Sequence, residues 1–168
     1  MMTKNEVKIE TKKHIKEVEL LLLRIVSELE NRAIAHDLSK FSKYELPIFE
    51  KYTSKLRDTT YGSDEYKQFL KEMKPALDHH YANNRHHPEC FTLTVADDFQ
   101  YHEKGKKNTI CCMNLIDIVE MLCDWMAATK RHTDGDIMKS IEINQERFGY
   151  SDELKQIFIN TVSTINNG

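Results

Sequence analysis

Residues 113–131, MNLIDIVEMLCDWMAATKR, are the most apolar stretch of the chain and decide the predicted fold class. Apolar side chains recur there at intervals of three and four residues, which is the period of one face of an α-helix. At about 100° per residue, one broad side of this helix carries Leu115, Ile118, Val119, Leu122, Trp125 and Met126. The only polar stripe consists of Asp117, Glu120 and Asp124. The stretch therefore predicts a mostly buried helix with one narrow row of carboxylates.

The helical period continues on both sides of this stretch. Further helices are predicted over residues 6–30, 31–40, 44–57, 64–84, 136–148 and 152–165. Ser63 is a predicted N-cap, and Pro75 predicts a kink or a fresh helix start. Residues 88–108 lose the period and predict a loop. Because there is no internal repeat and no dividing linker, we expect residues 1–168 to form one all-α domain, a compact bundle of six or seven helices.

The composition is that of an ordinary globular protein. Its 168 residues are enough for one hydrophobic core, with 40% apolar and 30% charged residues. A net charge of -3 without clustered positive charge argues against a nucleic-acid partner. The apolar run at residues 20–23 is too short for a signal peptide or a membrane span. We therefore expect a cytoplasmic protein that does not bind membranes.

Four cysteines occur in the chain, and none of them is part of a C-x-x-C pair. They are Cys90, the adjacent Cys111 and Cys112, and Cys123. Without that spacing they do not match a zinc site or a thiol-exchange motif. We expect them to be buried, reduced thiols.

Half of the eight histidines lie in one short segment, residues 78–89, DHHYANNRHHPE. They are His79, His80, His86 and His87, and a fifth histidine, His36, adjoins Asp37. Borderline divalent metals favour imidazole nitrogen together with carboxylate oxygen. A solvated helix end, at which the histidines cap carbonyl groups, is the structural alternative. Taken with His36 and Asp37, the cluster predicts a divalent-metal site.

The carboxylate row of residues 113–131 has two interpretations. It either forms a thin solvated face or faces an internal cation, because a buried unpaired charge is strongly disfavoured. The histidines elsewhere in the chain favour the cation.

His14 adds a geometric condition to the metal-site hypothesis. In one straight helix, His14 and His36 would stand about 33 Å apart. The helix must therefore turn back near residues 30–31, with Asn31 as the N-cap of a new helix, if both are ligands. A surface histidine among lysines is the alternative interpretation of His14.

The order of these motifs resembles the HD superfamily of metal-dependent phosphohydrolases. Residues 35–40, AHDLSK, are similar to its His-Asp-x-x-Lys core, and residues 85–89, RHHPE, are similar to the double-histidine element of its two-metal branches. The resemblance covers residues 14–131 and is closest to a small bacterial and phage branch. No Gly-Tyr-Pro follows the double histidine, so the resemblance does not extend to the cyclic-dinucleotide phosphodiesterases.

The resemblance implies an HD-like helical bundle with one or two divalent ions, which Mg, Mn, Fe, Co or Zn would all satisfy. The implied ligands are His14, His36, Asp37, His79, His80, His86, His87 and either Asp117 or Asp124. Asp124 is favoured because Cys123-Asp124-Trp125 better resembles the family's Ala-Asp helix.

In the implied reaction, water attacks phosphorus in a small phosphorylated molecule or a nucleotide. Asp37 bridges or ligates the metal. Glu120, or whichever of Asp117 and Asp124 is not a ligand, orients the histidines or accepts the water's proton. Lys40 and Arg85 neutralise the phosphate, with Lys40 counted among the catalytic residues. An iron-dependent oxygenase of HD type and a non-catalytic metal- or nucleotide-binding module stay as alternatives, and a homodimer is compatible with the sequence.

Overall fold

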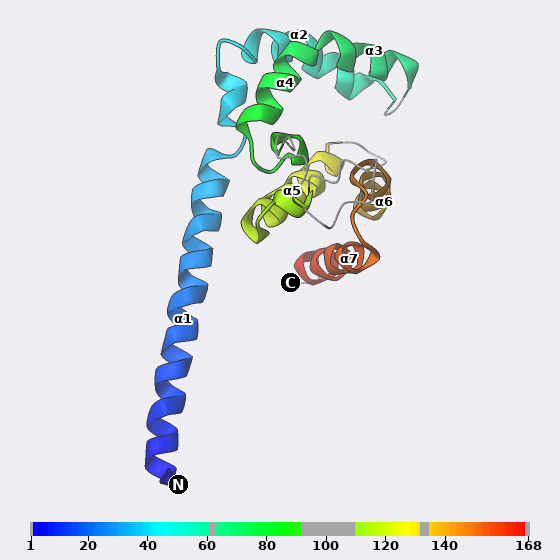
Figure 1. Ribbon diagram of the computed structural model, residues 1–168. Coiled ribbons are helices and arrows are strands. Elements are labelled where there is room, and N and C mark those ends of the chain that lie inside the picture. The colour runs from blue at the N-terminus through cyan, green and yellow to red at the C-terminus, as the bar shows by residue number, and fades with distance from the viewer. Residues whose placement is uncertain (1, 61–62, 92–109, 132–134, 167–168) are drawn as a thin grey trace, which may run out of the picture. The chain divides into compact units, whose positions relative to one another are not determined.

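The computed structural model describes residues 2–60, 63–91, 110–131 and 135–166, and these ranges contain helices but no strand (Figure 1). The α-helices are α1 (Lys4–Ala35), α2 (Leu46–Asp58), α3 (Asp64–Glu72), α4 (Lys74–Asn83), α5 (Leu115–Thr129), α6 (Ile137–Phe148) and α7 (Asp152–Asn166). Three short 3-10 helices are η1 (Leu38–Phe41), η2 (Pro88–Cys90) and η3 (Ile110–Cys112). The all-α class is confirmed, and most of the predicted loop at residues 88–108 lies outside the described ranges.

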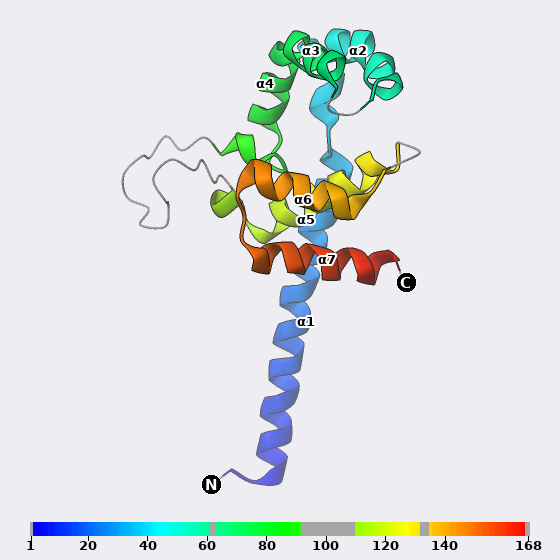
Figure 2. The same cartoon turned by 90° about the vertical axis from the view of Figure 1, so that its right-hand side faces the viewer.

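The chain divides into two compact units, Met1–His36 and Asp37–Gly168. The first unit is α1, a single unbroken helix (Figure 2). It begins with a capping box in which the Thr3 hydroxyl accepts the Glu6 N–H at 3.3 Å and the Glu6 carboxylate accepts the Thr3 N–H at 2.7 Å. The predicted helix restart at Asn31 is wrong. Residues 31–35 contain neither Gly nor Pro, so the backbone hydrogen bonds continue to Ala35.

The second unit carries the hydrophobic core, which is built on the apolar helix α5. Side chains from α5, α6 and α7 form its centre: Met121, Leu122, Met126, Ile141, Phe158 and Val162. The indole of Trp125 packs edge-on against Phe158, with ring centroids 5.7 Å apart. This packing fixes the position of α5 and of the carboxylates on its polar stripe. That residues 1–168 form a single domain stays a prediction.

Helices α3 and α4 replace the one helix predicted over residues 64–84. The Ser63 hydroxyl accepts the Tyr66 N–H at 3.1 Å, which confirms the predicted N-cap. The chain then restarts after Met73, and Pro75 lies in the first turn of α4, where its missing N–H costs nothing. Because α4 packs against both η1 and η2, its histidines lie close to the residues that precede η1.

The cysteines are not core residues, and the prediction that they are buried is wrong. Cys111, Cys112 and Cys123 are exposed, and Cys90 is half-buried. At η3 the buried side chains are those on either side of the cysteines, Ile110 and Met113.

The structure contains, in its described part, no helix with the length and apolar character that a bilayer crossing requires.

Candidate metal centre

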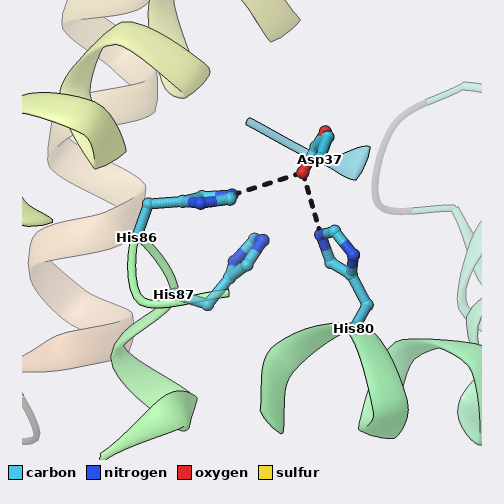
Figure 3. A group of neighbouring side chains, drawn as sticks. All are labelled: Asp37, His80, His86 and His87. Carbon is cyan, nitrogen blue, oxygen red and sulfur yellow. Dashed lines mark ion pairs between the residues drawn. The ribbon is translucent and has the colours of Figure 1, made fainter. Parts of the chain in front are cut away.

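Four side chains of the second unit bring ligand-type atoms together: Asp37, His80, His86 and His87 (Figure 3). One carboxylate oxygen and one nitrogen from each ring all lie within 4.8 Å of one another. Asp37 immediately precedes η1 in the left-handed backbone region, with φ 59° and ψ 10°. Aspartate tolerates this conformation better than most residues, and such strain is found preferentially at functional sites.

The rings of His80 and His86 converge on one oxygen of Asp37. His80 Nε2 lies 3.1 Å and His86 Nε2 3.5 Å from Asp37 Oδ1 (Figure 3). Both rings are almost fully buried, at 2% and 1% exposure, and His80 Nε2 has no hydrogen-bond partner. Two ligands about 2.1 Å from a tetrahedral or octahedral ion stand about 3.0–3.4 Å from each other. The separations are therefore close to those of atoms that share an ion.

A second carboxylate lies behind each of these rings. His80 Nδ1 is 2.9 Å from Glu45 Oε2, and His86 Nδ1 is 3.1 Å from Glu120 Oε1. A carboxylate only accepts hydrogen bonds, so each Nδ1 carries a proton, and in that neutral tautomer Nε2 is the atom with the lone pair. Two ring nitrogens and a carboxylate oxygen thus meet in a largely buried place, which is the arrangement of ligand atoms around a shared cation. Histidines that bind metals typically have such a carboxylate behind them.

The amide of Asn84 tests this assignment of the His80 proton. Its Nδ2 also lies 3.1 Å from His80 Nδ1, and a donor there would reverse the tautomer. Both of its N–H groups have nearer acceptors, however: the hydroxyl of Ser39 at 2.8 Å and the carbonyl of His80 at 2.7 Å. The Ser39 hydroxyl also lies 3.0 Å from His80 Nδ1, but it donates to Glu45 Oε2 at 3.2 Å and can accept from the ring. With both groups placed in this way, His80 Nδ1 donates to Glu45.

Glu45 was not foreseen from the sequence, although it joins two of the predicted histidines. It is fully buried, and its other oxygen lies 2.6 Å from His79 Nδ1. The His79 ring also stacks on Tyr44, with centroids 5.1 Å apart. His79 thus contacts Glu45 and is not a member of the four-residue group, whereas its neighbour His80 is.

His87 completes the group from the loop before η2. Its ring centroid lies 4.2 Å from that of His86 and 4.9 Å from that of His80. Burial, reinforced by the neighbouring His86 and His80, lowers the pKa of His87 to about 3. The ring is therefore neutral at neutral pH, which is the form that binds a metal.

The three carboxylates on the polar stripe of α5 have different contacts. Asp117 is fully buried and closes a capping box with Asn114. Its carboxylate also accepts hydrogen bonds from Arg85 Nε at 3.0 Å and Nη2 at 2.8 Å. Glu120 contacts His86, with Oε1 3.1 Å from Nδ1. An oxygen of Asp124 lies within 4.8 Å of an oxygen of Asp37. Of the two predicted downstream ligands, Asp124 is therefore at the cluster, and the structure gives Asp117 to helix capping and to Arg85.

Three further residues were predicted to belong to the site: Lys40, His14 and His36. Lys40 pairs with the second oxygen of Asp37, with Nζ 2.5 Å from Oδ2. His14 lies in the unbroken helix α1, where the 22 residues from position 14 to 36 rise about 33 Å. His14 and His36 therefore cannot share an ion, and the prediction that both are ligands of one site is wrong. His36, the last residue of the first unit, stays a predicted ligand.

Comparison with known proteins gives one finding about the family. Neither the curated proteins nor the solved structures contain a match to this chain. A family model, described as "Family of unknown function (DUF5662)", matches residues 3–167. Because this match covers nearly the whole sequence, the chain belongs to the DUF5662 family.

Proposed function

We propose that this protein is a divalent-metal-dependent phosphohydrolase that acts on a phosphoester in a small phosphorylated molecule or a nucleotide. The observation that carries the proposal is the convergence of His80 Nε2 and His86 Nε2 on Asp37 Oδ1, with a carboxylate behind each ring. The resemblance of residues 35–40 and 85–89 to the HD superfamily supports the same reaction class.

The residues present fit a divalent cation. Asp37, His80, His86 and His87 would hold it, and Asp124 lies close enough to Asp37 to add a further oxygen. When bound there, a divalent ion would supply Lewis acidity that polarises a phosphoryl oxygen and lowers the pKa of water. The mixture of nitrogen and oxygen ligands suits Mn, Fe, Co or Zn better than Ca, which prefers oxygen alone.

The remaining polar residues of the site position these ligands and compensate charge. Glu45 and Glu120 accept the Nδ1 protons of His80 and His86, which would leave the Nε2 lone pairs available to a cation. Lys40 is partly exposed beside Asp37, where its ammonium would also attract a phosphate. Arg85 has its guanidinium fork on Asp117, so we assign it a structural role in place of the predicted phosphate contact.

The test is a panel of phosphomonoesters, phosphodiesters and nucleotides, assayed with magnesium, manganese or cobalt. Asp37→Asn should abolish hydrolysis because it removes the charge at the point of convergence. Asp78→Asn is the matched control, since Asp78 lies in α4 near the histidines but is exposed and pairs with Lys74. His80→Ala should be inactive, and His14→Ala should retain full activity.

Two outcomes would overturn the proposal. One is phosphoester hydrolysis that persists unchanged in Asp37→Asn, which would place the chemistry elsewhere. The other is an iron-loaded protein that hydrolyses nothing in the panel but consumes O2 when a reductant is supplied, which would indicate an oxygenase instead.

A further inference from the structure

Two adjacent cysteines form a second cluster of metal-ligating atoms in a different part of the chain. Cys111 and Cys112 lie in η3, and both are exposed. Their Sγ atoms are 3.9 Å apart. The pair thus presents two sulfurs on the same side of one short turn.

The turn that carries the pair is anchored on both sides. Ile110 and Met113 are buried, at 4% and 9% exposure, and the Met113 N–H donates to the Ile110 carbonyl at 3.0 Å. The next residue, Asn114, is the N-cap of α5. Because the flanking residues are fixed, little conformational freedom remains to be lost when the two thiols bind one partner.

The distance between the sulfurs is close to that of two thiolates on one tetrahedral ion. Sulfur ligands about 2.3 Å from such an ion stand about 3.8 Å apart. A disulfide would require the same atoms to approach to about 2.05 Å. The observed 3.9 Å therefore matches a shared cation far better than a bond between the sulfurs.

We propose that Cys111 and Cys112 form a bidentate binding site for a thiophilic divalent cation, Zn²⁺ or Cd²⁺. Binding replaces two S–H bonds by two sulfur–metal bonds and releases two protons, so that no oxidant or reductant is needed. The site is distinct from the histidine and aspartate cluster, whose ligands are nitrogen and oxygen. It does not depend on the proposed phosphohydrolase activity.

The protonation of the thiols predicts how binding responds to pH. Burial and the hydrogen bond with Cys112 raise the pKa of Cys111 above its ordinary value. Because binding releases thiol protons whatever their exact affinity, the affinity for the metal should increase as the pH rises.

The test is a titration of the reduced full-length protein with Cd²⁺, followed by the ultraviolet charge-transfer band of cadmium–thiolate bonds. This band reports sulfur ligands only, so Cd²⁺ at the histidine cluster does not contribute. At saturation the band should have the amplitude of two cadmium–thiolate bonds per chain. Cys111→Ser and Cys112→Ser should each weaken binding about 100-fold, because the second sulfur no longer acts at high effective concentration. Cys123→Ser is the matched control, since it removes an exposed cysteine without a neighbouring thiol, and it should bind as the wild type does.

Mass spectrometry after alkylation gives a second measurement that needs no variant. Cd²⁺ should protect Cys111 and Cys112 together and leave Cys123 reactive. The proposal is overturned if Cys111→Ser gives the same thiolate band at the same Cd²⁺ concentrations as the wild type, if Cys123→Ser abolishes the band, or if excess Cd²⁺ leaves the pair open to alkylation.

Discussion

The carboxylate of Glu45 offers a sharp test of how the site is held together. It is fully buried and accepts hydrogen bonds from His79 Nδ1 at 2.6 Å and from His80 Nδ1 at 2.9 Å. Glu45→Gln keeps the size of this side chain but removes its charge and converts one oxygen into an NH2 donor. The amide can then accept from only one of the two rings.

Two effects of this substitution weaken metal binding. If the NH2 group faces His80, the ring must accept at Nδ1 and carry its proton at Nε2, which removes the ligand lone pair. If the oxygen faces His80, the tautomer is kept but the ring loses the negative charge that raises its basicity. Loss of such a supporting carboxylate typically lowers metal affinity 10- to 100-fold, which corresponds to about 1.4–2.7 kcal/mol.

The assay is a competition titration of Mn²⁺ or Co²⁺ against a chromophoric chelator, and Glu45→Gln should raise the Kd about 10- to 100-fold. Glu72→Gln is the control, because the Glu72 carboxylate accepts from Tyr52 and Gln68 and contacts no histidine in the described interactions. The reasoning is refuted if folded Glu45→Gln binds the metal as tightly as Glu72→Gln does.

Three further outcomes are expected from the same structure. Arg85→Ala should lower the free energy of unfolding by about 2 kcal/mol in urea titrations, because the buried Asp117 loses two charged hydrogen bonds. The metal content of this variant should not change, and a loss of bound metal would indicate that Asp117 is a ligand after all. Ile141→Ala should cost about 3 kcal/mol in the same assay, since this side chain is fully enclosed by the α5–α7 core, and a cost below about 1 kcal/mol would contradict that packing. His87 has a pKa of about 3 when folded and about 6.5 when unfolded, so the unfolded state binds the proton first. The stability of the metal-free protein should therefore decline as the pH falls below about 6.5, by up to about 1.4 kcal/mol per pH unit, and the same slope in His87→Asn would show that another group is responsible.

Much of the fold follows from local signals in the sequence. The 3.6-residue period gives α5, and Ser63 and Pro75 mark where helices begin. The error at Asn31 arose because asparagine favours N-cap positions without being able to interrupt a helix by itself. No glycine or proline lies near it to end α1.

The types of ligand at the candidate site could be predicted from the sequence, but the hydrogen-bond partners of those ligands could not. The segment around residues 78–89 and the His36-Asp37 pair indicate metal ligands by composition alone. The partners Glu45 and Asn84 were missed, because their contacts with Ser39 and His80 depend on how η1, α2 and α4 pack. Tertiary packing of this kind leaves no periodic trace in the sequence.

Asp117 and Asp124 show where a local signal was overlooked. They are seven residues apart, so they lie on the same side of α5 and a helical wheel does not separate them. The Asn114-x-x-Asp117 spacing is a capping-box pattern, however, and it would have assigned Asp117 to the helix start. For Cys111 and Cys112, by contrast, the 3-10 turn η3 decides which of the neighbouring side chains are buried.

The most direct test of the account is the metal content of the protein after incubation with Mn²⁺ or Co²⁺ and removal of excess ion. The wild type should retain at least one ion per chain, and Asp37→Ala and His80→Ala, shown by circular dichroism to be folded, should retain none. If both folded variants keep the wild-type amount of metal, then the buried atoms around Asp37 Oδ1 do not hold a cation and the central claim is wrong.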